Sequence, residues 1–153
     1  MVFVFIIYCF FTLNKLNYCI CKNNKNIIDI HPGDKGIDIT IILIEFLNKT
    51  TIKNGSHITQ YLVGDNTGCI HCNFYDDIGD IVQEGDILFL SGAYATIFKQ
   101  HLILYTAKYG VGRIIKLNEF FMTFSKKPNL SEYIYSIDNK DMYDKNNSNR
   151  YNK

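Results

Sequence analysis

The sequence predicts an all-β fold, a five-stranded Greek-key barrel with a short helical element between the third and fourth strands. Three observations support this fold class. Isoleucine, valine, threonine and tyrosine are abundant, and no long apolar helical period is visible. Strand-length apolar runs are separated by turns rich in glycine, asparagine and aspartate. The chain has 153 residues, 47% of them hydrophobic, which favours one domain with a substantial core.

The first two strands are expected to form a hairpin. Residues 37–47 are the first long strand, and their length suits a strand that curves around a barrel and serves both of its sheets. Asn54-Gly55 is the strongest short hairpin signal in the chain. Strand two then covers residues 57–65, and residues 65–68 form the next turn.

Strand three, residues 69–75, alternates between two kinds of side chain. The predicted core face carries Ile70, Cys72 and Phe74. The opposite face is polar and aromatic, as a wet surface that stacks bases would be, and it carries His71, Asn73 and Tyr75. Residues 76–84 are expected to form a short turn or helical cap.

Residues 84–109 hold strands four and five. Residues 87–90 form strand four and residues 102–105 form strand five. Tyr94 and Phe98 fall between them, in a segment with too few charges for an ordinary solvated loop. Exposed aromatic side chains near basic ones indicate a base-stacking surface, and the basic neighbours are Lys99, His101 and Lys108. Of these, Lys99 and Lys108 are the candidate phosphate contacts.

Residues 111–124 are expected to close the barrel. The resulting order is β-β-β-α-β-β, which is that of the OB-fold. This five-stranded Greek-key barrel binds oligonucleotides across strands two and three and the adjoining loops.

The chain divides into three parts by composition. Residues 1–26 form an apolar extension and a polar linker, residues 27–125 the folded domain, and residues 126–153 a polar tail that is expected to be disordered. The apolar run over residues 2–11 is too short for a membrane span, and no membrane association is expected. Three interpretations of residues 1–21 remain: a targeting leader, an ordered extension, or a wrongly assigned start of the coding region.

The distribution of charge argues against binding by charge alone. Residues 27–125 contain seven basic and eleven acidic side chains, a net charge of −4, whereas residues 126–153 carry a net charge of +2. A domain that held phosphates only by charge would be basic. Any affinity for nucleic acid must therefore depend on stacking and on a local basic groove.

No catalytic or metal-binding pattern is present in the sequence. There is no nucleophile elbow, no phosphate loop and no metal-ligand spacing, and Cys69 and Cys72 lack a second ligand pair downstream. The five cysteines do not form a regular disulfide framework. We therefore expect a protein that is not an enzyme and has no cofactor and no metal.

Several motifs resemble one family in order and in spacing. They include Asp29-Ile30-His31-Pro32-Gly33, residues 63–68, residues 75–79, Gly85-Asp86, residues 92–99 and residues 104–106. With these motifs the chain resembles the DNA-binding subunits of the SOSS complex, a family of simple eukaryotic single-stranded-DNA-binding proteins with one OB-fold. The likeness covers residues 27–133, and the ungapped run over residues 75–106 is its specific part.

The resemblance also implies which residues stack on bases. The family uses four aromatic residues; its strand-three tryptophan corresponds to Tyr75, and the other three are identical here as Tyr94, Phe98 and Tyr105. Aromatic residues of β-domains are otherwise more often part of the core, and Tyr105 faces outward only if its strand is regular. His71 is open between a base contact and an ordinary strand residue. The full predicted site is Tyr75, Tyr94, Phe98, Tyr105, Lys99, His71, Asn73 and Lys108.

The family's role is what the resemblance implies for this chain. It is single-stranded DNA binding in DNA repair and the DNA damage response, within a nuclear complex that contains a large scaffold subunit and a small third subunit. The extension at residues 1–21 has no counterpart in the family, so targeting to an organelle is the alternative location. Two other functions remain open: binding of RNA or tRNA by the same face, and an OB domain that serves only protein interaction.

Overall fold

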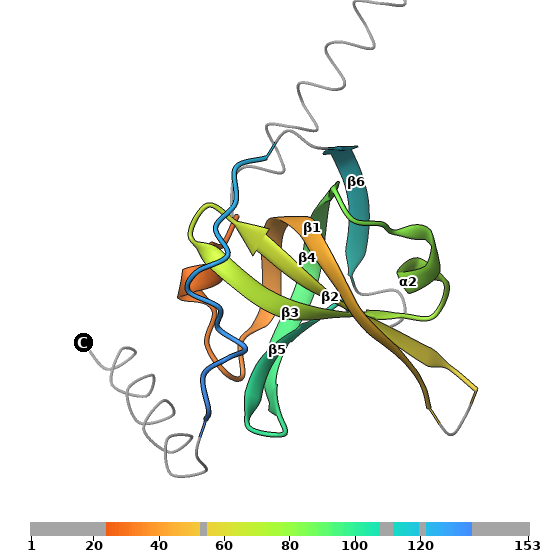
Figure 1. The fold of residues 1–153 in the computed structure, drawn as a ribbon, viewed down its shortest axis with the longest axis horizontal. Coiled ribbons are helices and arrows are strands. Elements are labelled where there is room, and N and C mark those ends of the chain that lie inside the picture. The colour runs from red at the N-terminus through yellow and green to blue at the C-terminus, as the bar shows by residue number, and fades with distance from the viewer. Residues whose placement is uncertain (1–23, 53–54, 108–111, 120–121, 136–153) are drawn as a thin grey trace, which may run out of the picture.

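The computed structural model describes residues 24–52, 55–107, 112–119 and 122–135. This part of the chain contains six strands, one short helix and one 3-10 turn (Figure 1). In chain order they are the 3-10 turn η2 (Ile27–Asp29), β1 (Lys35–Thr51), β2 (His57–Asp65), β3 (Gly68–Tyr75), α2 (Asp77–Ile81), β4 (Asp86–Phe98), β5 (His101–Tyr105) and β6 (Arg113–Glu119).

Five of the strands close into a ring. The order β1-β2-β3-β5-β4 returns to β1 through a second pairing of β1 with β4. All these pairs are antiparallel except β3 with β5, which is parallel. The ring and the helix between β3 and β4 confirm the predicted five-stranded Greek-key barrel.

Strand β1 serves both halves of the barrel, as its length predicts. Residues 35–42 pair with β4, and residues 42–51 pair with β2. The strand runs for 17 residues and has register shifts in both pairings, which let a long strand bend around a barrel. In Figure 1 the end of the β1–β2 hairpin and the end of the β4–β5 hairpin project from the same end of the barrel.

The core lies inside this ring. In β3 the side chains of Ile70, Cys72 and Phe74 are fully buried, as predicted for the core face. The rings of Tyr61 and Phe74 meet edge to face there, with centroids 5.9 Å apart. The Tyr61 hydroxyl donates a hydrogen bond to the carbonyl of Val82, 3.0 Å away, and so ties β2 to the chain just after α2.

Strand β4 is longer than the sequence indicated, and this corrects the expectation for Tyr94. Gly92 does not end the strand; it takes a φ of 75° and donates its N–H to Asp38 Oδ1 at 3.0 Å. The chain bends at this glycine, leaves β6 and continues beside β5. Tyr94 therefore lies within a strand, and Phe98 is the last residue of that strand. The loop is only Lys99-Gln100, and its positive φ values of 49° and 70° match the tight turn that suits a two-residue hairpin.

The described residues among 111–124 do not close the barrel as expected. Arg113–Glu119 form β6, which pairs with β4 outside the ring, while Leu117 and Phe124 are 38% and 41% exposed. The side chain of Ile114 does pack against the core. The ring is complete without β6, because β1 already pairs with β4.

The first residues of the expected tail are packed against the barrel. Leu130 and Ser131 are buried, and Asn129 forms a parallel bridge with Cys69 beside the first half of β3. This segment occupies the place next to β3 that the five-residue β5 is too short to reach, since β5 pairs only with residues 71–73. The expectation of disorder from residue 126 is therefore wrong for residues 126–135, and residues 136–153 lie outside the described part.

Candidate nucleic-acid interface

The predicted site residues that the structure describes gather on the outer face of three adjacent strands and at the tip of their hairpin. Residues paired across a ladder share a face, as do residues two apart along a strand. In one row, Asn73 of β3 is opposite Tyr105 of β5, which is opposite Tyr94 of β4. The neighbouring rows carry His71, Ile103 and Thr96, and then His101 and Phe98. Tyr75 extends the same face at the end of β3.

Three tyrosines form a stacked cluster on this face. The rings of Tyr94 and Tyr105 are nearly parallel, with centroids 5.2 Å apart and planes inclined by 9°. Tyr75 stacks on Tyr105 from β3, with centroids 6.4 Å apart and planes inclined by 29°. The hydroxyl groups of Tyr75 and Tyr94 lie 3.1 Å apart and share a hydrogen bond. The cluster is thus held by two ring contacts and one hydroxyl contact.

Burial raises the pKa of two of these phenols, Tyr75 and Tyr105. Desolvation, and then the hydrogen bond to Tyr94, raise the pKa of Tyr75 well above its usual range. Burial and the nearby Tyr94 also raise the pKa of Tyr105.

Phe98 lies at the tip of the β4–β5 hairpin, on the same face as Tyr94. Its side chain is 54% exposed, and Lys99 Nζ lies 5.4 Å from the centroid of its ring. A cation held over an aromatic face is weakly attracted to it. The tip therefore offers an aromatic ring and a positive charge together, as a base and its phosphate require.

Asn73 is on the predicted face, but it is buried rather than open. It is 7% exposed, and its Oδ1 accepts a hydrogen bond of 2.8 Å from Gln60 Nε2 of β2. Gln60 Oε1 in turn accepts a hydrogen bond of 3.2 Å from Asn48 Nδ2 of β1. Sequence reasoning missed Gln60 and Asn48. The only signal that could have found them is the β1–β2–β3 register, because it places both amides in the row of Asn73.

His71 is half-buried beside the C-terminal segment. Its backbone N–H donates to Ser131 Oγ at 2.8 Å, and the same hydroxyl donates to the carbonyl of Leu102 at 2.5 Å. Burial, and then the nearby His101, lower the pKa of His71 below its usual value. The ring of His101 is held too, with Nδ1 2.7 Å from the carbonyl oxygen of Ser131. Lys108, the remaining predicted contact, lies outside the described residues.

The back of the β1–β2 hairpin is fixed to α2. Lys49 Nζ lies 2.5 Å from one carboxylate oxygen of Asp80, and His57 Nε2 lies 3.0 Å from the other. The hydrogen bond from Lys49 is the main cause of the lowered pKa of Asp80. Lys49 is thereby directed to α2 and away from the face that carries Asn48 and Gln60.

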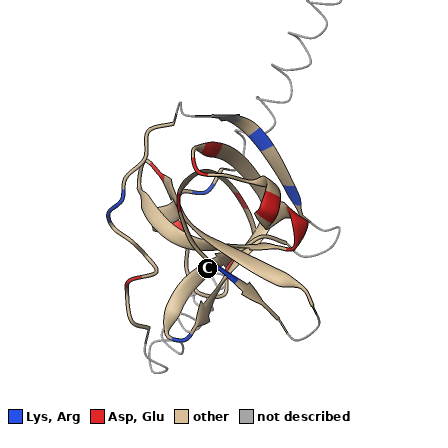
Figure 2. Cartoon of the chain, turned by 45° about the vertical axis from the view of Figure 1, so that its right-hand side comes forward, with Lys and Arg blue, Asp and Glu red and all other residues tan. Residues whose placement is uncertain are grey.

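Charge is spread thinly over the described surface. Figure 2 shows Lys and Arg on separate elements, such as β6 and the C-terminal segment, while acidic residues mark α2. No group of three or more His, Cys, Asp or Glu side chains in the described residues could hold a metal ion. Among the described residues, no helix is long and apolar enough to cross a membrane.

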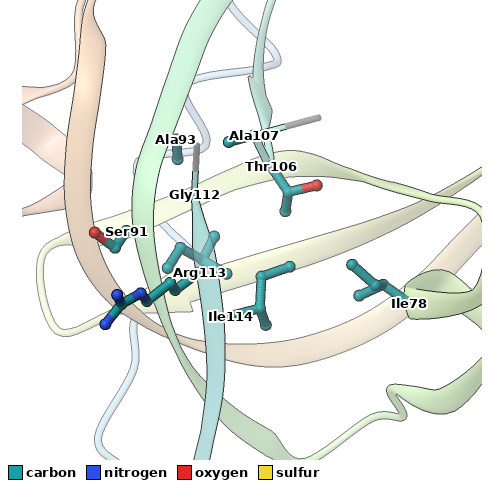
Figure 3. A pocket seen from close by; sticks show the side chains of 9 residues that line it. Ile78, Ser91, Ala93, Thr106, Ala107, Gly112, Arg113 and Ile114 are labelled. Atoms are coloured by element: carbon teal, nitrogen blue, oxygen red, sulfur yellow. The ribbon is translucent and has the colours of Figure 1, made fainter. Parts of the chain in front are cut away.

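A small cavity is lined by none of the three tyrosines of the cluster. It measures about 240 Å³ and is bounded by β4, β6, the end of β5 and α2. Figure 3 shows the side chains of Ile78, Thr106 and Ile114 around it. Pockets for drug-sized ligands usually measure about 300–1,000 Å³. We therefore place the candidate site on the open outer face and not in this cavity.

The closed ring, the helix between β3 and β4, and the outward aromatic face define an OB-fold, a class that binds oligonucleotides on such a face. The family model described as "Single-stranded DNA binding protein Ssb-like, OB fold" matches residues 30–114, more than half of the chain. The chain belongs to this family of single-stranded-DNA-binding OB-fold proteins. Domains of this kind bind single strands through stacking and a groove that follows the backbone, and they are binding modules rather than enzymes.

Two solved structures show the same fold. The solution structure of hypothetical protein F20O9.120 from Arabidopsis thaliana has a TM-score of 0.59 and 22% sequence identity, and the match covers 74% of this chain and 86% of that one. The second OB-fold domain of replication protein A from Methanococcus maripaludis has a TM-score of 0.50 and 20% identity, with 63% of this chain and 96% of that one covered. At such low identities the likeness concerns the fold.

Proposed function

We propose that the protein binds single-stranded DNA by stacking bases on the outer face of β3, β4 and β5. The observation that carries this proposal is the alignment of Tyr75, Tyr94 and Phe98 on one face by the strand register. Tyr75 and Tyr94 are half-buried, and Phe98 is largely exposed. Base–aromatic stacking needs no particular sequence, because every base has a π-face.

The proposal gives the remaining site residues distinct roles. Tyr105 is 9% exposed and supports the rings of Tyr75 and Tyr94 from below. Lys99 supplies charge for a phosphate near Phe98, and Lys108 is proposed to do the same. His71 contributes an edge of the face beside His101.

We further propose that this binding serves DNA repair and the DNA damage response in the nucleus. The support is the motif likeness to the DNA-binding subunits of the SOSS complex over residues 27–133. By that likeness, the partners are a large scaffold subunit and a small third subunit. Purification of the tagged protein from its own cells tests this part, because co-purification of two such subunits is expected. Exclusion of the protein from the nucleus would contradict it.

A competition experiment tests the binding function itself. Labelled single-stranded DNA is bound to the protein and then challenged with unlabelled single-stranded DNA, RNA or duplex DNA of the same sequence. Duplex DNA should compete far less, since it hides its base faces. Equal competition by duplex would contradict stacking, stronger competition by RNA would make RNA the ligand, and no binding to any strand would leave a protein-interaction domain.

Salt dependence provides a second measurement. The affinity of a protein for nucleic acid falls with salt in proportion to the number of phosphates it neutralises. Because residues 27–125 carry a net charge of −4, we expect a shallow salt slope. A steep slope would show that charge dominates and that the stacking proposal is incomplete.

A further inference from the structure

A row of amide side chains crosses the barrel next to the tyrosine cluster. Asn48 Nδ2 donates to Gln60 Oε1 at 3.2 Å, and Gln60 Nε2 donates to Asn73 Oδ1 at 2.8 Å. The strand register pairs Asn48 with Gln60, and Gln60 with Asn73. The three amides therefore form one directed chain of hydrogen bonds across β1, β2 and β3.

Exposure decreases along this row. Asn48 is exposed, Gln60 is half-buried and Asn73 is 7% exposed. Asn73 is also opposite Tyr105 in the β3–β5 ladder. The buried end of the row is thus linked to the stacked tyrosines, and the open end faces solvent. Asn73 acts as a positioning residue for Gln60.

Beyond these contacts with described residues, Gln60 retains one hydrogen-bond donor and one acceptor site. A glutamine amide has two N–H donors and two acceptor lone pairs on its oxygen. Asn73 uses one donor and Asn48 uses one lone pair. A glutamine amide that keeps a donor and an acceptor can bind the N6 amino group and a ring nitrogen of adenine.

Gln60 is also a neighbour of a candidate stacking ring. The residue opposite Tyr75 on β2 is Ile58, so Gln60 is the diagonal neighbour of Tyr75 on the same face. Diagonal neighbours in an antiparallel pair lie about 7–8 Å apart. A base that stacks on Tyr75 therefore has its hydrogen-bonding edge within reach of the Gln60 amide.

From these observations we propose that Gln60, held in place by Asn73, hydrogen-bonds the edge of a base stacked at Tyr75, so that the protein recognises bases by their donors and acceptors as well as by their ring faces. This inference rests on the proposed single-stranded DNA binding and adds a specificity-determining residue to it. The ligand group is a base edge with a donor beside an acceptor, as adenine presents.

Two single-stranded oligonucleotides, compared in separate titrations, test the inference in the wild-type protein. One strand is oligodeoxyadenosine, and the other carries purine deoxynucleosides, which keep the ring but lack the N6 amino group. A bidentate amide–base contact discriminates by about fivefold or more, so the purine strand should bind at least about fivefold more weakly. Equal affinity for the two strands would overturn the inference while leaving single-strand binding intact. Absence of binding to both strands would overturn the proposed function as well.

Gln60→Met then assigns the effect to this side chain. Methionine keeps the length and flexibility of glutamine but removes both polar atoms. The variant should bind the two strands within about twofold of each other, because it retains stacking but loses the base-edge contact. Gln83→Met is the matched control, since Gln83 is an exposed amide just after α2, and it should discriminate as the wild type does. Full discrimination by Gln60→Met would overturn the role of Gln60, and the wild-type comparison remains decisive if that variant does not fold.

Discussion

Tyr94 and Tyr105 lie ring against ring, with centroids 5.2 Å apart and planes 9° from parallel. This contact indicates that the four predicted aromatic residues do not all have the same role. Tyr105 is only 9% exposed and also touches Tyr75, so it supports other rings and has little surface left for a base. Tyr75, Tyr94 and Phe98 are the members of the set with more open side chains.

Alanine substitutions at Phe98 and Tyr105 should separate the two roles. Phe98→Ala removes an exposed ring, so binding of single-stranded DNA should weaken by about 5- to 150-fold without a change in stability. Tyr105→Ala should weaken binding and also lower the free energy of unfolding, because it removes a buried ring from the cluster. Fluorescence anisotropy and thermal unfolding give the two quantities. Loss of stability in Phe98→Ala would contradict its position on the surface.

Tyr75→Trp should tighten binding. Tyr75 is half-buried on the outer face, so a larger ring adds stacking area without overpacking the core. The substitution also removes the hydroxyl contact with Tyr94, and Tyr75→Phe measures that loss separately. Titration with single-stranded DNA and thermal unfolding should show a gain in affinity for tryptophan relative to phenylalanine at similar stability. Lower stability with no gain in affinity would show that the tyrosine cluster has no room for the indole.

Local sequence patterns predicted strands two and three well. The range 57–65 and the core positions Ile70, Cys72 and Phe74 both match the structure, although Asn73 on the opposite face is buried too. These elements have clean period-two patterns and end at clear turns, so local information is sufficient.

Longer-range pairing explains what the sequence did not predict. Strand four was expected to end at residue 90, yet Gly92 is a bend within the longer strand. The bend is recognisable only from the contact of Gly92 with Asp38 and from the new partner strand β5. The position of Gln60 beside the candidate site follows only from its pairing with Asn73. Leu130 is an isolated apolar residue in a polar tail. It is buried because its segment packs beside β3, and the sequence around Leu130 does not show that this place is open.

Stability should fall at acidic pH, in part because of His71. Burial lowers the pKa of His71 in the folded protein below the usual value of about 6.5. As the pH falls through that usual value, the unfolded chain binds a proton before the folded chain does, so protonation favours unfolding. This loss of stability is absent at pH values above the usual pKa, and it grows as the pH falls to the pKa of His71 in the folded protein.

The measurement is the free energy of unfolding at about pH 7.5 and about pH 5.5. The groups that act electrostatically on His71 are His101, which lowers its pKa, and Glu132, which raises it. His71→Gln keeps the backbone hydrogen bond to Ser131 but removes the titrating ring, so it should lose less stability on acidification than the wild type does. An equal loss in both proteins would assign the effect to other groups.

The last prediction concerns Ser131, whose hydroxyl joins β3 to β5 just beyond their ladder. It accepts the N–H of His71 and donates to the carbonyl of Leu102, and the residue is 2% exposed. Ser131→Ala leaves both backbone groups without this partner, and each buried unsatisfied group costs about 1–3 kcal/mol. We therefore expect a clear decrease in the free energy of unfolding, measured by denaturant titration.

Two truncations provide the control: a chain that ends at residue 135 should unfold as the full chain does, and one that ends at residue 125 should be less stable, because it loses Leu130 and Ser131. Equal stability of the two truncated chains would show that the packed segment contributes nothing and would return the domain boundary to residue 125.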